Sequence, residues 1–249
     1  MPNKEEFFLD ISTKNEARFC FMIWDYFQCS EIFDIEVVES SILCSYERHA
    51  LVFGNPNEEI IRRFTPIGET SISYDPDWFP IIEKYFTKFS LLDLSAGDKS
   101  HNTFLCMELK EDEFKAKENS ISRKLTDDEY KFLSFRRRIL FSQGLGGVGI
   151  VEGNKIVGRA FSPHVVQEKN YSFAIMRDVF VDPSCRNRGF GYDLSSKICE
   201  IIFDKGIEKC ILWVEKNNLH AVKIYEKLGF KTKDKVRSNY CLRKKDIKS

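Results

Sequence analysis

The chain has 249 residues, of which 43% are hydrophobic and 31% charged, so it can bury a large core in one or two domains. Its formal net charge of zero argues against a dedicated nucleic-acid-binding protein. No stretch is long and apolar enough to cross a membrane, and the first residues lack the features of a signal peptide, so we expect a cytoplasmic protein.

The zero net charge hides a division along the chain. Residues 1–130 hold 14 Lys and Arg against 26 Asp and Glu, a net charge of −12, and residues 131–249 hold 24 against 12, a net charge of +12. The two parts therefore differ in electrostatic role or present complementary surfaces. The eight cysteines form no Cys-x-x-Cys pair, so we expect reduced thiols and no metal site.

The first half predicts a mixture of helices and strands, and its first 120 residues carry no recognisable motif. Apolar spacing predicts a helix over residues 14–29, strands over 35–44 and 50–53, short helices over 58–64 and 78–86, and a strand over 102–109. Residues 110–119 are charged and poor in apolar side chains. We place a linker there, which predicts domains over residues 1–119 and 120–249.

The second domain is expected to begin with a strand over residues 121–125 and a helix from the cap Thr126 to about residue 141. The basic run at 136–138 is better explained as a solvated helix end than as a nucleic-acid contact. Residues 144–149 fit Gly-x-Gly-x-x-Gly, but they follow a helix and lead into a hairpin of strands 148–151 and 156–161. These glycines therefore indicate a helix stop and a turn, and not a dinucleotide site.

A strand over residues 172–182 leads into the most informative stretch, Val179-Phe-Val-Asp-Pro-Ser-Cys-Arg-Asn-Arg-Gly-Phe-Gly191. Pro183 ends the strand, and Arg186-x-x-Gly189-x-Gly191 leads directly into an amphipathic helix that stops at Gly206. The glycines let the backbone approach a ligand, and the first amides of the helix face the loop. With the arginines nearby, a pyrophosphate is the expected occupant.

The rest of the chain predicts a strand over residues 210–214, a helix capped by Asn217 or Asn218 and stopped by Gly229, and closing strands from Phe230 to near Leu242. The second domain then has the order β-α-β-β-β-α-β-α-β-β.

The loop resembles the acetyl-CoA loop of the GNAT N-acetyltransferase superfamily, Gln/Arg-x-x-Gly-x-Gly/Ala after a Val-x-Val strand. Residues 217–230, Asn-Asn-Leu-His-Ala-Val-Lys-Ile-Tyr-Glu-Lys-Leu-Gly-Phe, resemble a second signature of that superfamily. Both lie in the right order, with a helix and a strand between them. The resemblance covers about the last half of the chain and implies an α/β fold with a mixed sheet. The smaller α/β domain before it is either a degenerate second copy or an unrelated module.

The resemblance also implies site residues. It gives the pantetheine arm of acetyl-CoA to backbone groups of Val179, Phe180 and Val181, and the pyrophosphate to amides of Arg186, Asn187, Arg188, Gly189, Phe190, Gly191 and Tyr192. Asn218 would contact the cofactor, and Tyr225 would protonate the departing sulfur. Tyr225 alone could be a core residue, but its place seven positions after Asn218 and just before Leu-Gly-Phe favours the functional role.

The general base is the least defined part. Many superfamily members carry a glutamate where this chain has Arg177, next to Asp178. Asp178 is therefore either the base or a structural hydrogen-bond acceptor, and a water relay would also suffice. Glu215 and His220 are poorer candidates. Cys185 is interpreted as incidental, because direct acetyl transfer needs no nucleophile.

The resulting hypothesis is an acetyl-CoA-dependent N-acetyltransferase, monomeric or homodimeric, that acts directly on a primary amine, with the N-terminal domain helping to form the acceptor site. The acidic half favours a small cationic acceptor, although opposed charges could instead hold the domains together. The alternatives are a non-catalytic acyl-CoA-binding or regulatory module and an enzyme that acetylates protein amino groups.

Overall fold

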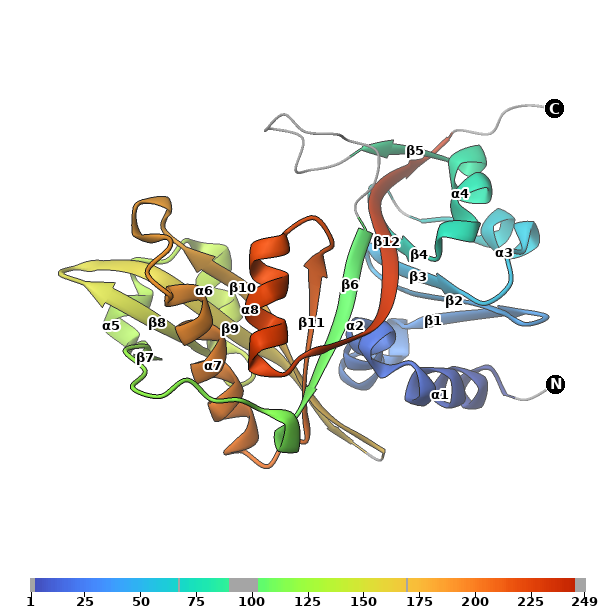
Figure 1. Ribbon diagram of the computed structural model, residues 1–249. Coiled ribbons are helices and arrows are strands. Elements are labelled where there is room, and N and C mark those ends of the chain that lie inside the picture. The colour runs from blue at the N-terminus through green and yellow to red at the C-terminus, as the bar shows by residue number, and fades with distance from the viewer. Residues whose placement is uncertain (1–2, 67, 90–102, 169, 245–249) are drawn as a thin grey trace. The chain divides into compact units, whose positions relative to one another are not determined.

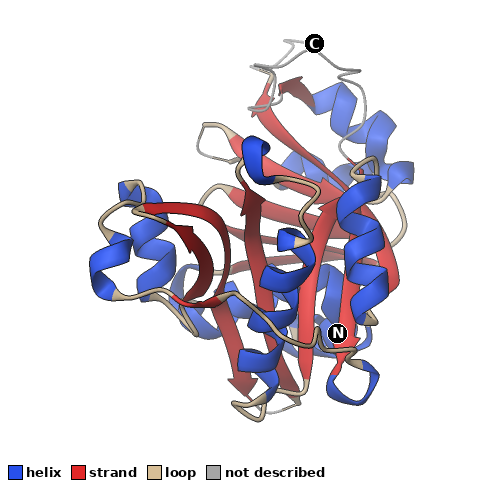
Figure 2. Ribbon diagram, turned by 60° about the vertical axis from the view of Figure 1, so that its left-hand side comes forward, coloured by secondary structure: helices blue, strands red, loops and turns tan. Residues whose placement is uncertain are grey.

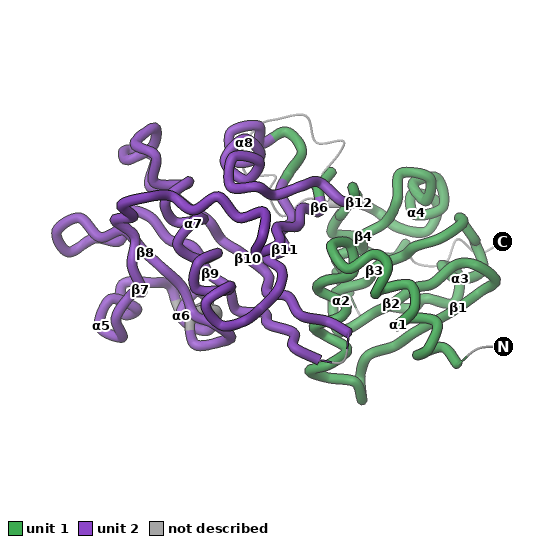
Figure 3. Tube along the Cα trace, turned by 60° about the horizontal axis from the view of Figure 1, so that its bottom comes forward, with its two compact units in different colours: residues 1–105, 215–217, 234–249 green, residues 106–214, 218–233 purple. Residues whose placement is uncertain are grey.

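The structure is a computed structural model, and it describes residues 3–66, 68–89, 103–168 and 170–244 (Figure 1). The chain divides into two compact units (Figure 3). Residues 1–105, 215–217 and 234–249 form the first unit, and residues 106–214 and 218–233 form the second. The sequence predicted a single division after residue 119, whereas the units divide after residue 105 and the end of the chain returns to the first unit.

The first unit is an α/β unit built on a mixed sheet. Its strands lie in the order β1-β2-β3-β4-β12, and β5 also pairs with β12. The elements are α1 (Lys4–Lys14), α2 (Glu16–Gln28), β1 (Asp34–Val38), β2 (Ser41–Tyr46), β3 (His49–Phe53), α3 (Glu58–Arg63), β4 (Thr70–Tyr74), α4 (Phe79–Tyr85), β5 (Phe86–Phe89) and β12 (Lys231–Arg243).

Several predictions for this unit needed correction. The single strand predicted over residues 35–44 is wrong, because the chain turns at Glu39, whose φ is +55°, and forms the hairpin of β1 and β2. The predicted helix over residues 14–29 corresponds to α2, whereas α1 and β4 were not predicted. The predicted pair of closing strands is one strand, β12.

A buried arginine fixes β12 within the first unit. Arg18 of α2 is 4% exposed and donates to both carboxylate oxygens of Asp234, at 2.5 and 2.6 Å. It also donates to Asp75 at 2.5 Å. A buried guanidinium needs such partners, because a charge buried without them is costly.

The hydrophobic core of this unit includes the fully buried Trp78, whose indole N–H donates to the carbonyl of Gly54 at 3.0 Å.

The second unit is also α/β, with the strand order β6-β11-β10-β9-β8-β7. Its elements are β6 (Thr103–Lys110), β7 (Arg123–Lys124), α5 (Asp127–Tyr130), α6 (Phe135–Ser142), β8 (Gly147–Glu152), β9 (Lys155–Glu168), β10 (Tyr171–Val181), α7 (Phe190–Phe203), β11 (Lys209–Glu215) and α8 (Leu219–Leu228). The predicted hairpin is confirmed as β8 and β9. The single helix predicted from Thr126 is two short helices.

Helices cover opposite faces of this sheet (Figure 2). A Cβ on Gly158 of β9 would meet Leu194 of α7, so Gly158 faces α7. Side chains alternate along a strand, so Phe161 faces the other way, where it packs with Leu125 and Leu133 in a second cluster. The face opposite α7 is therefore the one that carries the α5 and α6 region.

The two units repeat one order of elements. Apart from β7, which precedes the helices of the second unit, and β5 of the first unit, each has two helices, three antiparallel strands, a helix, a strand parallel to the third of these, another helix, and a final strand. That final strand comes from the other half of the sequence in both cases, β12 in the first unit and β6 in the second. The repetition is compatible with the alternative that the first unit is a degenerate copy of the second.

The loop after the third strand differs between the units. In the first unit β3 and β4 pair over four positions, and only residues 54–57 separate β3 from the short helix α3. The Trp78 indole already occupies the carbonyl of Gly54 there. Only the second unit carries the glycine-containing loop predicted to hold a pyrophosphate. No helix in the described part of the chain is long and apolar enough to cross a membrane.

Candidate active site

The loop between β10 and α7 is shaped by its own side chains. Asp182 accepts hydrogen bonds from the amide and hydroxyl of Ser184 at 3.0 and 2.7 Å, and it pairs with Lys155 at 2.6 Å. The bond from Lys155, followed by those from Ser184, holds the pKa of Asp182 well below its ordinary value. The strand thus ends at Val181, before the glycines begin, as Pro183 predicted.

Gly189 makes the loop open at the start of α7. It has a φ of +79° and ψ of 4°, a left-handed conformation that L side chains rarely adopt. A Cβ there would meet nothing within 4 Å, so the space above the backbone is empty of protein. Gly189 is the N-cap of α7, and the first helix amides have no intrahelical acceptor. This arrangement fits a pyrophosphate.

Two predicted arginines flank this opening. Arg188 pairs with Glu152 at 2.6 Å and lies 4.4 Å from the centre of the Phe190 ring. The Nε atom of Arg186 donates to the carbonyl of Val181 at 3.3 Å. Both side chains are exposed, so they can reorient toward an anionic ligand at modest cost. Contacts with a phosphate stay predictions for both.

Strands β10 and β11 separate where the sequence predicted the pantetheine arm. Their parallel pairing covers Phe173–Ile175 with Lys209–Ile211, and no further pair is found among the described residues, although β10 continues to Val181. On its other edge β10 pairs irregularly with β9, with register shifts on both sides of Arg177. Backbone groups of Val179–Val181 on the β11 side are thus free of that ladder. An extended ligand can form hydrogen bonds with such backbone groups, as a neighbouring strand would.

Tyr225 lies on α8 and is 7% exposed. Its ring meets Phe230 edge-on, with centres 5.7 Å apart. Burial raises the pKa of the hydroxyl well above its ordinary value, and the nearby Cys210 and Cys199 add to the effect. The hydroxyl therefore keeps its proton at neutral pH, which a proton donor requires. The ring also packs in the core, and the role of Tyr225 as a proton donor stays a prediction.

Asn218, and not Asn217, caps α8. Its Oδ1 accepts from the amide of Ala221 at 3.2 Å, and its side chain is exposed. The bond occupies the oxygen and leaves the side-chain N–H groups outside the cap. Contact between Asn218 and a cofactor stays a prediction.

Asp178 is held by two arginines. Its Oδ2 accepts from Nε of Arg159 at 3.0 Å and from Nε of Arg137 at 3.1 Å, and its Oδ1 accepts from Nη2 of Arg159 at 3.4 Å. Its φ is +47°, as at a bulge. The carboxylate is an occupied acceptor, which favours the structural role over that of general base.

Sequence reasoning missed Asp193, which anchors the start of α7. Asp193 is 1% exposed, pairs with Lys117 at 2.7 Å, and accepts from the Ser120 hydroxyl at 2.8 Å and the Ser122 amide at 2.9 Å. Burial favours a higher pKa, but the bonds from Lys117, Ser122 and Ser120 outweigh it and lower the pKa to about 2. The chain before β7 is thereby tied to the helix that carries the loop.

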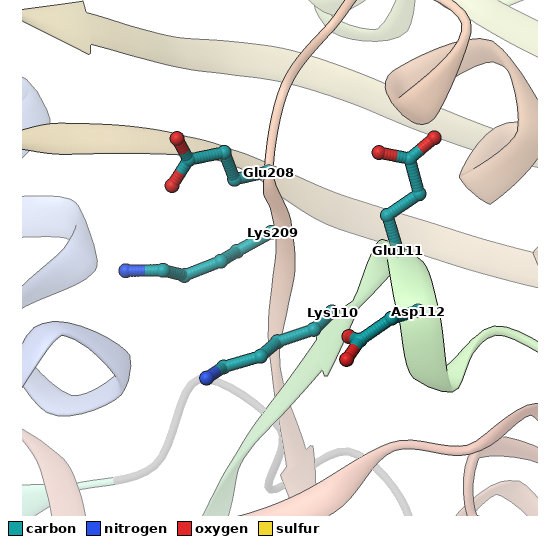
Figure 4. A pocket seen from close by; sticks show the side chains of 5 residues that line it. All are labelled: Lys110, Glu111, Asp112, Glu208 and Lys209. Atoms are coloured by element: carbon teal, nitrogen blue, oxygen red, sulfur yellow. The ribbon is translucent and has the colours of Figure 1, made fainter.

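A pocket lies at another part of the second unit, with a volume of about 300 Å³ (Figure 4). It is lined by Lys110, Glu111, Asp112, Glu208 and Lys209, where β6 ends and β11 begins. Because Lys209 pairs with Phe173, near the start of β10, this pocket is at the end of the sheet away from Val181. It is not part of the loop site.

The order of elements, with this loop after β10, the last of the four antiparallel strands β7 to β10, is that of an N-acetyltransferase fold. A family model described as "Acetyltransferase (GNAT) family" matches residues 106–230. The chain therefore belongs to the GNAT acetyltransferase family, as the two sequence signatures indicated.

Individual relatives are more distant. An uncharacterized N-acetyltransferase of Methanocaldococcus jannaschii is 38% identical over 64 residues, which span 26% of this chain and 28% of that protein. A GCN5-related N-acetyltransferase from Kribbella flavida is similar in structure with a TM-score of 0.54 and 12% identity, over 87% of this chain and 91% of that one. A GCN5-related N-acetyltransferase-like protein from Streptococcus suis gives 0.51 and 14%, over 92% and 99%. The likeness in fold thus extends well beyond residues 106–230.

Proposed function

We propose that this protein is an acetyl-CoA-dependent N-acetyltransferase that moves an acetyl group directly to a primary amine. The observation that carries the proposal is the backbone of the second unit: an open, left-handed Gly189 at the start of α7 follows a strand that has just separated from its parallel neighbour. An elongated molecule with a pyrophosphate at one end suits that arrangement. Family membership supplies the reaction class.

The proposed roles are those that the resemblance to the family implies for these residues. Amides of residues 186–192 hold the pyrophosphate, and backbone groups of Val179–Val181 hold the pantetheine arm, with an amide near Val181 facing the thioester oxygen. Acetyl-CoA supplies an activated acyl group. Tyr225 donates its proton to the departing sulfur, for which its buried, protonated hydroxyl is suited. The side-chain amide of Asn218 binds the cofactor while its oxygen caps α8.

The proton on the acceptor amine has to leave by some route. The bonds from Arg137 and Arg159 occupy Asp178, and they favour a water relay over direct transfer to that carboxylate. Asp178 as the base is the second candidate. A fall in kcat at low pH that Asp178→Asn abolishes would favour the direct route.

The charge pattern is the basis for a small, positively charged acceptor. By compact units, the first holds 16 basic and 21 acidic residues and the second 22 and 17, net charges of −5 and +5. This division has the same sign as that between the halves of the sequence but is smaller, because the basic residues 234–249 belong to the first unit and the acidic residues 106–130 to the second. A cation is still favoured by the acidic unit, and CoA by the basic one.

The test is free-thiol release from acetyl-CoA with a panel of polyamines, aminoglycosides, amino acids and lysine-containing peptides. Thiol release with small amines supports the proposal. Release with peptides alone would favour the acetylation of protein amino groups. CoA binding without turnover on any acceptor would favour a non-catalytic acyl-CoA-binding module.

A further inference from the structure

Three charged side chains from three elements meet at the bulge of β10. Arg159 comes from β9, Arg137 from α6 and Asp178 from β10, and both Nε atoms donate to the same oxygen of Asp178, at 3.0 and 3.1 Å. All three residues belong to the second unit. The cluster contains two guanidinium groups and one carboxylate, so it carries one surplus positive charge.

The surplus charge belongs to Arg137. The Arg159 side chain is only 8% exposed, makes two bonds to Asp178, and its guanidinium carbon lies 4.2 Å from the centre of the Phe180 ring. Arg159 is thus packed and neutralised, as a buried charge has to be. The Arg137 side chain is 42% exposed and donates through Nε alone; its Nη1 and Nη2 atoms have no hydrogen-bond partner in the described part of the chain.

The cluster lies beside the backbone to which the proposed function assigns the thioester. Asp178 directly precedes Val179–Val181 in the sequence. Arg159 is two residues from Phe161 on β9, so both face away from α7, on the side of α6. Because α7 covers the other face of the sheet, an acceptor reaches this backbone from the side on which Arg137 lies.

We propose that the acceptor is an amine that carries a carboxylate, as an amino acid does, and that the Nη1 and Nη2 edge of Arg137 binds this carboxylate. The inference rests on the proposed function. A guanidinium edge with two free donors matches the two oxygens of a carboxylate. A single negative charge balances the single surplus charge, whereas a phosphate dianion would exceed it and repel Asp178. A basic amino acid satisfies both this site and the charge pattern of the units.

The experiment compares L-lysine, L-glutamate and L-phenylalanine with their carboxamides as acceptors, with thiol release as the readout. The wild-type protein should prefer at least one acid over its amide by ~10–100-fold in kcat/KM, the range expected for one charge-assisted contact. Arg137→Gln should remove this preference by lowering kcat/KM for the acid while leaving the amide within about twofold. Arg137→Lys should restore part of it. Arg138→Gln, which removes the same charge from the next position of α6, is the matched control and should retain the preference.

Two outcomes would overturn the inference. One is the absence of turnover with every acid, or no preference for any acid over its amide. The other is an equal loss for acid and amide in Arg137→Gln, which would show that Arg137 only positions Asp178. Calorimetry with CoA and the full amine panel separate these from failure of the proposed function. In both cases CoA binding to the wild-type protein and to Arg137→Gln stays equal and some amine is still acetylated, whereas a protein that binds no CoA, or that acetylates no amine, fails the proposed function itself.

Discussion

Replacing Gly189 by glutamate should abolish cofactor binding with little loss of stability, and Gly206 offers a matched control. Both glycines flank α7, with φ of +79° and +70°, and a Cβ at either position would meet nothing within 4 Å. Gly189→Glu and Gly206→Glu therefore impose the same kind of backbone strain and the same added charge. They differ in that only Gly189 lies in the proposed pyrophosphate loop.

The magnitudes follow from the geometry. An L residue in the left-handed region costs about 1–2 kcal/mol, so each variant should unfold about 2–8 °C below the wild type. At Gly189 the side chain also enters the phosphate space with a like charge. Loss of two amide bonds to a charged phosphate, at about 1.5–3 kcal/mol each, weakens binding by about 10²–10⁴-fold.

Calorimetric titration with CoA measures the affinity, and thermal unfolding with and without CoA measures how much CoA binding stabilises the folded protein. At a CoA concentration of about 100 Kd, the wild type and Gly206→Glu should each gain about 2.7 kcal/mol of stability, and Gly189→Glu should gain almost none. If Gly189→Glu binds CoA within about threefold of Gly206→Glu, the pyrophosphate does not lie over this loop and the assignment is refuted.

Three further predictions concern chemistry, pH and salt. Tyr225→Phe keeps the ring against Phe230 and should lower kcat by ~10²-fold or more with CoA affinity nearly unchanged; full activity would mean that another group protonates the sulfur. Asp193→Asn removes the carboxylate that pairs with Lys117 and should destabilise the protein by about 2–4 kcal/mol in urea titrations. Because the folded pKa of Asp193 is lowered to about 2, its stabilising contribution is complete above about pH 4 and should be lost as the pH falls toward 2. If the difference in urea midpoint between the wild type and Asp193→Asn stays constant over this pH range, the prediction is wrong. For a cationic acceptor, KM should rise severalfold between low salt and ~0.5 M, where the Debye length is a few ångströms, with little change in thermal stability; a salt effect on stability alone would favour charges that only hold the units together.

The parts predicted correctly from the sequence depend on nearby residues. The loop between β10 and α7 and the helices α7 and α8 were found because their glycines, caps and apolar spacing act within a few residues. Asn218 could not be distinguished from Asn217 as the cap, since Asn is a suitable N-cap at either position. The choice depends on the residue at which the backbone becomes helical, which is Leu219.

The parts that were missed depend on distant partners. β4 reads as Thr-Ser-Ile-Ser-Tyr, a weak strand signal, and it is held by β3 and by β12, which lies more than 160 residues later. Asp193 meets Ser120 and Ser122 across 73 and 71 residues. Asp178 is likewise separated from Arg137 by 41 residues, so no local pattern indicated that its oxygen is already occupied.

The exchange of final strands has a consequence for how the chain is made and trimmed. Residues 1–105 leave the ribosome long before Asp234, which neutralises Arg18, and before β12, which pairs with β4 and β5. The unit that is synthesised first is therefore completed last, and a nascent chain has to keep an unfinished sheet edge and an Arg18 paired with Asp75 alone until residues 231–243 have been made. A stop codon after Phe230, at the end of the family match, would leave the loop and Tyr225 in place. It would nevertheless unfold residues 1–105, the part of the first unit that is farthest in sequence from the deletion. Limited proteolysis of such a truncated protein should cut first within α1 to β4, more than 150 residues from the deletion.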